Sequence, residues 1–152
     1  MTVDVFIASL DSKPVVGRLL EFNEYEFSRI DDRPIGPDGR YGYRYLDNYW
    51  DPKERRFPYL LQVDDELAGL ALVAERSAVT SFGEFLVLPK FRRRGVGLEA
   101  ARLILRRHPG PWEVTQVQGN EAATAFWRRA IPVPYDERTE ADGHVVQTFT
   151  ID

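Results

Sequence analysis

The sequence predicts an α+β protein with a mixed, mostly antiparallel sheet of about six or seven strands and helices on both faces. Strand-length apolar stretches outnumber helical ones along the chain. Most neighbouring strands are separated only by turns, as in antiparallel hairpins. A helix stands between two strands only around residues 81–118. The 152 residues are enough for one core and too few for two, so residues 1–152 are expected to form a single domain.

The first elements are a strand and a long helix. Residues 3–8 predict the strand, and a helix follows from a cap at Asp11 or Ser12 to about Ile30, with Pro14 in its first turn. Residues spaced three or four apart give this helix one largely apolar face. They are Val16, Leu19, Leu20, Asn23, Phe27 and Ile30.

Residues 31–56 are rich in Pro, Gly, Asp and Tyr and follow no sustained period, which predicts a long loop with at most short helical turns. Loops of this length in small domains are usually functional or disordered. Four tyrosines and Trp50 argue against disorder.

The remaining elements alternate in type. Residues 57–63 and 67–74 predict a hairpin around an acidic turn, and a third strand is expected at 81–88. Helices are expected from about 95 to 108 and from a cap at Asn120 to about 130, since prolines follow each of them. Residues 112–119 alternate as a strand, and 133–139 are expected to pair with the C-terminal strand that begins at 144.

Charge is distributed unevenly along the chain. Residues 90–129 hold nine Lys or Arg and three acids, whereas the remainder holds 11 basic and 21 acidic residues, for a net charge of -4. The basic segment favours an anionic ligand, and the remainder favours a cation. Solvated charged faces without a partner are the alternative.

Composition excludes several classes of site. The chain has no cysteine, so disulfides, thiolate metal sites and a cysteine nucleophile are excluded, and only His108 and His144 offer imidazole. We expect no metal. No apolar run is long enough for a membrane span and no basic leader precedes one, which predicts a cytoplasmic protein that does not bind membranes.

The stretch VLPKFRRRGVG, residues 87–97, carries the strongest motif. A strand that leads through glycines into a helix leaves backbone N–H groups unpaired at the helix start, where the helix dipole also favours an anion. Gly95 and Gly97 would let a phosphate approach those amides. A helix start with solvated arginines is the alternative. Nucleic-acid binding is not expected, because the chain is acidic and has no accompanying nucleic-acid motif.

This stretch resembles the acyl-CoA pyrophosphate loop of the GNAT superfamily of N-acetyltransferases, [QR]-x-x-G-x-[GA]. Arg92, Gly95 and Gly97 match its fixed positions. Asn120, Ala123 and Phe126 match the family's downstream N-x-x-A-x-x-F helix. The resemblance covers nearly the whole chain and implies a GNAT-like fold with acetyl-CoA as cosubstrate.

The resemblance also implies a set of donor-binding residues. The backbone of one strand would pair with the pantetheine arm, the helix start would hold the pyrophosphate, and the downstream helix would line the other side of the arm. The residues are Phe85, Leu86, Val87 and Leu88 for the first group, Arg92, Arg93, Arg94, Gly95, Val96, Gly97 and Leu98 for the second, and Asn120, Phe126 and Trp127 for the third. Arg128 and Arg129 are further phosphate candidates.

Glu84 is the candidate general base for direct attack by an amine. A carboxylate is unusual in an otherwise apolar strand, and family members often carry a base at this place. A structural ion pair is the alternative. The backbone N–H of Val87 is a candidate donor to the acetyl oxygen.

Trp127 departs from the family pattern, which often has tyrosine there to protonate the CoA thiolate. Indole N–H has no useful acidity, so water, Tyr135 or Tyr45 would serve, or the thiolate leaves unassisted. A noncatalytic acyl-CoA-binding module of the same fold is therefore the alternative function.

The acceptor is expected to be the amine of a small molecule or a protein. Tyr43, Tyr45 and Trp50 are its candidate binding residues, through cation-π contacts, and packing against the core is the alternative. His108 and His144 are expected to be structural or exposed. A homodimer is compatible with the exposed sheet edges of this architecture, but nothing in the sequence decides it.

Overall fold

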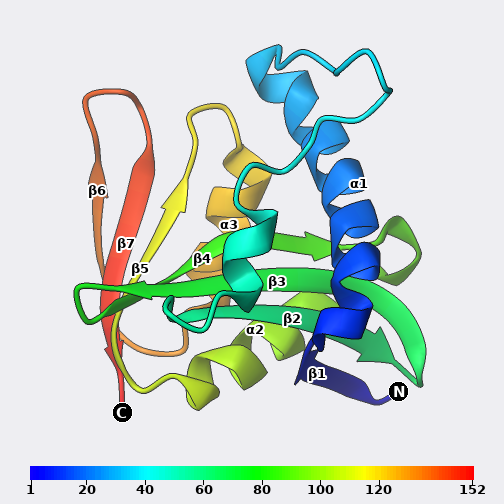
Figure 1. Ribbon diagram of the computed structural model, residues 1–152. Helices are drawn as coiled ribbons and strands as arrows, with labels where there is room; N and C mark the ends of the chain where they lie inside the picture. The colour runs from blue at the N-terminus through cyan, green and yellow to red at the C-terminus, as the bar shows by residue number, and fades with distance from the viewer.

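The computed structural model describes residues 1–152. A seven-stranded sheet in the order β1-β2-β3-β4-β5-β7-β6 forms its centre (Figure 1). Every neighbouring pair is antiparallel except β4 and β5, which are parallel. The strands are β1 (Val3–Ile7), β2 (Arg56–Val63), β3 (Glu66–Arg76), β4 (Val79–Val87), β5 (Gly110–Gln116), β6 (Asp136–Thr139) and β7 (Val145–Ile151).

Helices cover both faces of the sheet, as the sequence predicts. The helices are α1 (Lys13–Asp31), α2 (Val96–Arg107) and α3 (Glu121–Ala130), with short 3-10 turns at Leu10–Ser12, Leu46–Trp50 and Pro89–Phe91. One core cluster packs α2 and α3 against the sheet, and a second packs α1 and the Leu46–Trp50 turn against the opposite face. The α+β prediction is therefore confirmed.

The sheet opens between β4 and β5. These strands pair only at Thr80 with Trp112 and at Ser81 with Glu113. β4 continues along β3, whereas β5 pairs along its whole length with β7. Figure 1 shows the two halves of the sheet turning away from each other at this point. The divergence leaves a gap in the middle of the sheet that side chains of both strands enter.

A β-bulge in β4 changes which side chains face which helix. Val73 pairs with Phe82 and Leu72 pairs with Glu84, so Gly83 is an extra residue in β4. Phe82 consequently shares the α2 and α3 face with Phe85, with ring centroids 5.6 Å apart. Glu84 turns to the α1 face.

Glycine is required at the bulge. A Cβ at Gly83 would lie 2.9 Å from the Tyr49 hydroxyl, closer than Cβ atoms are found to other atoms. The side chain of Tyr49 is buried in the α1 cluster and cannot move away easily. A glycine inside a strand is a known sign of a bulge or of close approach, and it is the signal that would have predicted this feature.

Element bounds differ most from the sequence expectation at two strands. The hairpin partner expected at 133–139 begins at Asp136, because Pro134 has no N–H for a strand ladder. The strand expected at 112–119 spans Gly110–Gln116, and residues 117–119 turn toward α3. None of the helices combines the length and the hydropathy that a membrane span requires.

Candidate active site

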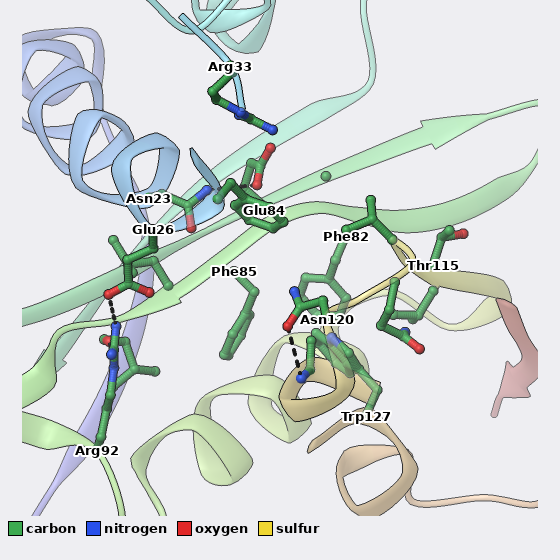
Figure 2. Close-up of a pocket in the computed structure, with 18 residues that line it drawn as sticks. Asn23, Glu26, Arg33, Phe82, Glu84, Phe85, Arg92, Thr115, Asn120 and Trp127 are labelled. Atoms are coloured by element: carbon green, nitrogen blue, oxygen red, sulfur yellow. Dashed lines mark hydrogen bonds and ion pairs between the residues drawn. The ribbon is translucent and has the colours of Figure 1, made fainter. Parts of the chain in front are cut away.

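A cavity of about 380 Å³ occupies the gap between β4 and β5 (Figure 2). Residues of β4 and β5 form two walls, α1 contributes a third, and the start of α3 closes the fourth. The polar and charged side chains in it are Asn23, Glu26, Arg33, Glu84, Arg92, Thr115, Gln116 and Asn120. The cavity therefore joins the α1 face of the sheet to the α2 and α3 face.

Glu84 is the central ionisable group of this cavity. The bulge directs its side chain toward α1, where Asn23 Nδ2 donates a 2.8 Å hydrogen bond to Glu84 Oε2. Burial raises the pKa of the Glu84 carboxyl to about 7, the hydrogen bond from Asn23 opposes this rise, Glu24 adds to it, and Arg33 again opposes it. Near neutral pH this carboxyl can therefore both accept and release a proton.

Arg33 lies over the same carboxyl in Figure 2, from the loop after α1. Its guanidinium is held by Asp31, with Nε 2.8 Å from Asp31 Oδ1, and by an ion pair with Glu24. These contacts fix the end of α1 beside the cavity. Arg33, Asp31 and Glu24 together carry a net charge of -1. This wall therefore favours a cationic ligand over an anionic one.

Two tyrosines lie behind Glu84. Burial raises the pKa of the Tyr43 and Tyr49 phenols, and the charge of Glu84 raises both further. They are therefore neutral neighbours of Glu84.

The backbone of β4 offers polar groups to the gap. The N–H of Leu88 donates to Ala68 O at 2.8 Å, so it points to β3. Because backbone directions alternate along a strand, the N–H of Leu86 also points to β3, and those of Phe85 and Val87 point into the gap. Phe85 and Val87 are thus available to a ligand, whereas the Leu86 and Leu88 amides are committed to the sheet.

A second cavity of about 420 Å³ lies at the start of α2. No backbone N–H of residues 93–98 donates to a protein acceptor, as expected for a helix N-terminus. Gly95 caps the helix with φ of 78°, in the region that favours glycine. A Cβ at Gly97 would lie 3.1 Å from Phe126 Cε1. Unpaired amides in an open cradle fit a pyrophosphate.

The three consecutive arginines have different surroundings. Arg92 Nε donates to Val87 O at 2.7 Å and its Nη2 lies 2.5 Å from Glu26 Oε1, so it ties β4 to α1. Arg93 lines the second cavity together with Arg129. Arg94 lies over the Phe91 ring, outside both cavities. Arg128 pairs with Glu137 at 2.7 Å.

The start of α3 supports both cavities. Asn120 caps the helix, its Oδ1 accepting from Ala123 N–H at 3.3 Å. Trp127 is 5% exposed and packs against Phe82, Phe85 and Phe126. The indole N–H groups of Trp50 and Trp112 donate to backbone oxygens, but that of Trp127 has no protein acceptor. Trp127 is thus a packed wall of the gap with a free donor.

The structure does not bring the predicted acceptor residues into the central cavity. Tyr43 lines a separate hollow beside the start of α1, Tyr45 is 41% exposed, and Trp50 donates to Ala8 O at 3.1 Å. Their rings pack on the loop and the α1 cluster and do not line the central cavity, so their role in acceptor binding stays a prediction.

The two candidate acids also lie elsewhere. Tyr135 lines a surface hollow beside β7, and Tyr45 is outside the cavity. His108 contacts Tyr59 and His144 contacts Asp142, both outside the cavity, in line with the structural or exposed roles expected for them. No group of three or more His, Cys, Asp or Glu residues is arranged to hold a metal ion.

Sequence reasoning missed five polar residues that line the cavity, namely Asn23, Glu26, Arg33, Thr115 and Gln116. Asn23 carried a signal, since it is a polar residue on the otherwise apolar face of α1. Arg33, Thr115 and Gln116 have no feature in the sequence that would have predicted a place in the site, because only the packing of the loop and of β5 brings them to the gap.

A profile of the Acetyltransferase (GNAT) family matches residues 22–131. The match covers well over half of the chain, and the chain therefore belongs to the GNAT family of acetyltransferases. No curated protein matches it.

Solved structures agree in fold. An acetyltransferase from Thermus thermophilus superposes with a TM-score of 0.75 at 16% identity, covering 99% of this chain and 98% of that one. A Salmonella typhimurium acetyl transferase that modifies the N-terminal serine of ribosomal protein L7/L12 gives 0.69 at 16% identity, covering 100% and 96%. The PaiA N-acetyltransferase of Thermoplasma acidophilum, in complex with coenzyme A, gives 0.65 at 9%, covering 99% of each chain.

Proposed function

We propose that this protein is an N-acetyltransferase that moves the acetyl group of acetyl-CoA to the amine of a small molecule or a protein. The observation that carries the proposal is the position of Glu84, an ionisable carboxyl with a pKa raised to about 7, in the gap between β4 and β5. The enzyme works by direct attack, with Glu84 as general base.

The chain offers a matching set of groups to acetyl-CoA. The free amides of residues 93–98 hold the pyrophosphate, with Arg93 and Arg129 on the rim of that cavity. The Phe85 and Val87 backbone groups bind the arm from one side and the α3 start from the other. Acetyl-CoA supplies an acetyl thioester, which is activated toward amines. The N–H of Val87 donates to the acetyl oxygen.

Glu84 performs the proton transfer. An amine attacks only in its neutral form, and it gains acidity as its nitrogen bonds to carbon. The Glu84 carboxylate accepts that proton. A base with a pKa near 7 is ionised in a large share of molecules at neutral pH and is much more basic than an ordinary carboxylate.

Trp127 does not act as a general acid, since its indole N–H does not ionise in the accessible pH range. Its free N–H can donate a hydrogen bond toward the sulfur without transferring a proton. The thiolate is then protonated by water. A CoA thiolate leaves readily enough near neutral pH for this to support modest turnover.

Charge supports a cationic acceptor. On the α1 side, Glu26 and Arg33 line the cavity, and Glu24 and Asp31 both pair with Arg33. The second cavity, at the start of α2, is lined by the basic residues Arg92, Arg93 and Arg129. Opposite signs on the two sides of the gap would draw an anionic donor to one side and an ammonium to the other. The Salmonella relative's protein substrate makes protein N-termini one class to include.

The direct test is thiol release from acetyl-CoA with a panel of small amines, polyamines and basic peptides. Release with at least one amine, together with its acetylated product, supports the proposal. Tight acetyl-CoA binding without product from any amine would favour the acyl-CoA-binding module, which the tryptophan at position 127 keeps as the second candidate.

A further inference from the structure

We propose that a hollow beside the start of α1 is a second binding site, for a small organic carboxylate whose charge is held by Arg18 and Arg40. This hollow, which we call the α1 hollow, lies between the helix and loop residues 40–46. It shares no lining residue with the central cavity or with the cavity at the start of α2. The inference therefore goes beyond the proposed transferase function and does not depend on it.

The α1 hollow has a fixed outer wall, because the loop after α1 runs back beside the helix (Figure 1). Glu21 of α1 ties this loop down, since its two carboxylate oxygens accept the N–H groups of Tyr41 at 2.6 Å and Gly42 at 2.9 Å. A Cβ at Gly17 would lie 3.3 Å from Leu46 Cδ2, so the end of the loop packs closely on the helix. The space left between helix and loop is about 540 Å³, which is within the range of small-molecule pockets.

The α1 hollow is basic, although the part of the chain that forms it is acidic overall. Lys13, Arg18 and Arg40 line it, and Glu21 is the acid among its lining residues. Both Glu21 oxygens are occupied by backbone N–H groups, and Lys13 Nζ lies 2.5 Å from Asp47 Oδ1. The charges left over are the two guanidinium groups, and together they attract an anion.

Neither of these guanidinium groups has a partner in the protein. The side chains of Arg18 and Arg40 make no hydrogen bond, ion pair or cation–π contact, and both residues are exposed. Arg93 and Arg129, which line the cavity at the start of α2, are free in the same way. A free guanidinium presents parallel N–H groups that match the two oxygens of a carboxylate. The α1 hollow therefore offers a carboxylate two donors that no protein group uses.

Part of the lining of the α1 hollow is apolar, which favours an organic anion over an inorganic one. Leu10, Pro14 and Leu46 contribute this part. Leu10 is 64% exposed, the highest value among the large hydrophobic side chains. A ligand with an apolar body would cover these side chains while its carboxylate reaches the arginines. An inorganic anion would leave them in water.

The test is calorimetry with phenylbutyrate, an apolar body that carries one carboxylate, on protein saturated with CoA so that the cradle at the start of α2 is filled. We expect one-to-one binding with a Kd at or below about 1 mM. Phenylbutanol, which has the same body without the charge, should bind at least about tenfold more weakly. Equal affinity for the two probes, or no binding of phenylbutyrate up to about 10 mM, overturns the proposal.

Arginine variants locate the binding site. Arg18→Ala and Arg40→Ala should each raise the Kd for phenylbutyrate about fivefold or more. Arg29→Ala is the matched control, since this exposed arginine of α1 lies over the Tyr25 ring outside the hollow and should leave the Kd unchanged. Because Arg18 and Arg40 have no protein partners, their replacement should not change the thermal unfolding midpoint. Wild-type affinity in both variants would place the ligand elsewhere and overturn the proposal.

A second pair of variants tests the apolar contact. Leu10→Ala should raise the Kd for phenylbutyrate about threefold or more, because it removes apolar surface that the ligand covers. Phe22→Ala removes a side chain that is 59% exposed on α1 outside the hollow, and it should have no effect. Equal effects of the two substitutions contradict the proposed position of the ligand. None of these measurements requires acetyl transfer, so they decide this proposal whatever the amine panel shows.

Discussion

The two sides of the central gap differ in how they are built. The phosphate cradle on the proposed donor side is one continuous segment, residues 93–98, whose backbone amides are unpaired. The proposed acceptor side is assembled from α1, the loop after it and a bulged strand, and the side chains of Asn23, Glu84 and Arg33 line it. A local backbone motif is visible in a sequence, whereas a wall made from three distant segments appears only after folding.

The largest expected effect is on the acceptor side. Glu84→Gln should lower kcat by at least about 100-fold while CoA affinity stays unchanged, because it removes the proton acceptor and keeps the shape of the side chain. Steady-state kinetics and calorimetry with CoA measure the two quantities. Glu66→Gln, at a surface ion pair with Lys90, is the matched control and should retain full activity. A Glu84→Gln enzyme with wild-type kcat would remove Glu84 from the chemistry.

The same substitution should stabilise the fold at high pH. The pKa of Glu84 is raised from 4.5 to about 7 in the folded protein, so the fold loses stability as pH rises from about 4.5 to about 7 and the loss is complete above that. At pH 9 this corresponds to about 3 kcal/mol in the free energy of unfolding, whereas at pH 4 wild type and Glu84→Gln should differ little. Urea unfolding at the two pH values measures the difference. If the difference in free energy of unfolding between wild type and Glu84→Gln is no larger at pH 9 than at pH 4, the burial of this carboxyl is contradicted.

On the donor side, Gly97→Val should weaken acetyl-CoA binding by about tenfold or more, since a side chain beside Phe126 fills the cradle. The KM for the amine should change little. Ala122→Val, on the exposed face of α3, tests for a general effect of added bulk. If Gly97→Val changed the KM for acetyl-CoA and the KM for the amine equally, the donor and acceptor sides of the gap would not be separate binding sites.

The arginines provide the smallest and most selective contrast. Arg93→Ala should raise the KM for acetyl-CoA a few-fold, because this rim charge lies at the donor cavity. Arg94→Ala should have no measurable effect, since its side chain lies over Phe91 outside the cavity. Initial rates at varied acetyl-CoA concentration give the KM of each variant. Equal changes in KM for Arg93→Ala and Arg94→Ala would mean that the arginines act only through their overall charge.

The sequence predicted the position of the helix start that forms the second cavity, whereas its role in binding the donor stays a prediction. Gly95 and Gly97 are where the pattern requires them, and the α+β order followed from hairpin turns and apolar periods. Glu84 was identified because a carboxylate is conspicuous in an apolar strand. The sequence could not show that Tyr43, Tyr45 and Trp50 lie outside the central cavity, because an aromatic loop that packs on a helix has the same composition as one that lines a pocket. Asn23 was counted with its apolar neighbours on α1, since spacing reports which face is buried and not what that face contacts.

The most direct test of the account is the pH dependence of kcat at saturating acetyl-CoA and amine, in the wild type and in Glu84→Gln. A general base with the environment of Glu84 predicts a rate that rises with pH and levels off above an apparent pKa near 7. In Glu84→Gln this rise should disappear from the residual rate while CoA binding persists. A rise with the same midpoint in Glu84→Gln would contradict the assignment of Glu84 as the base.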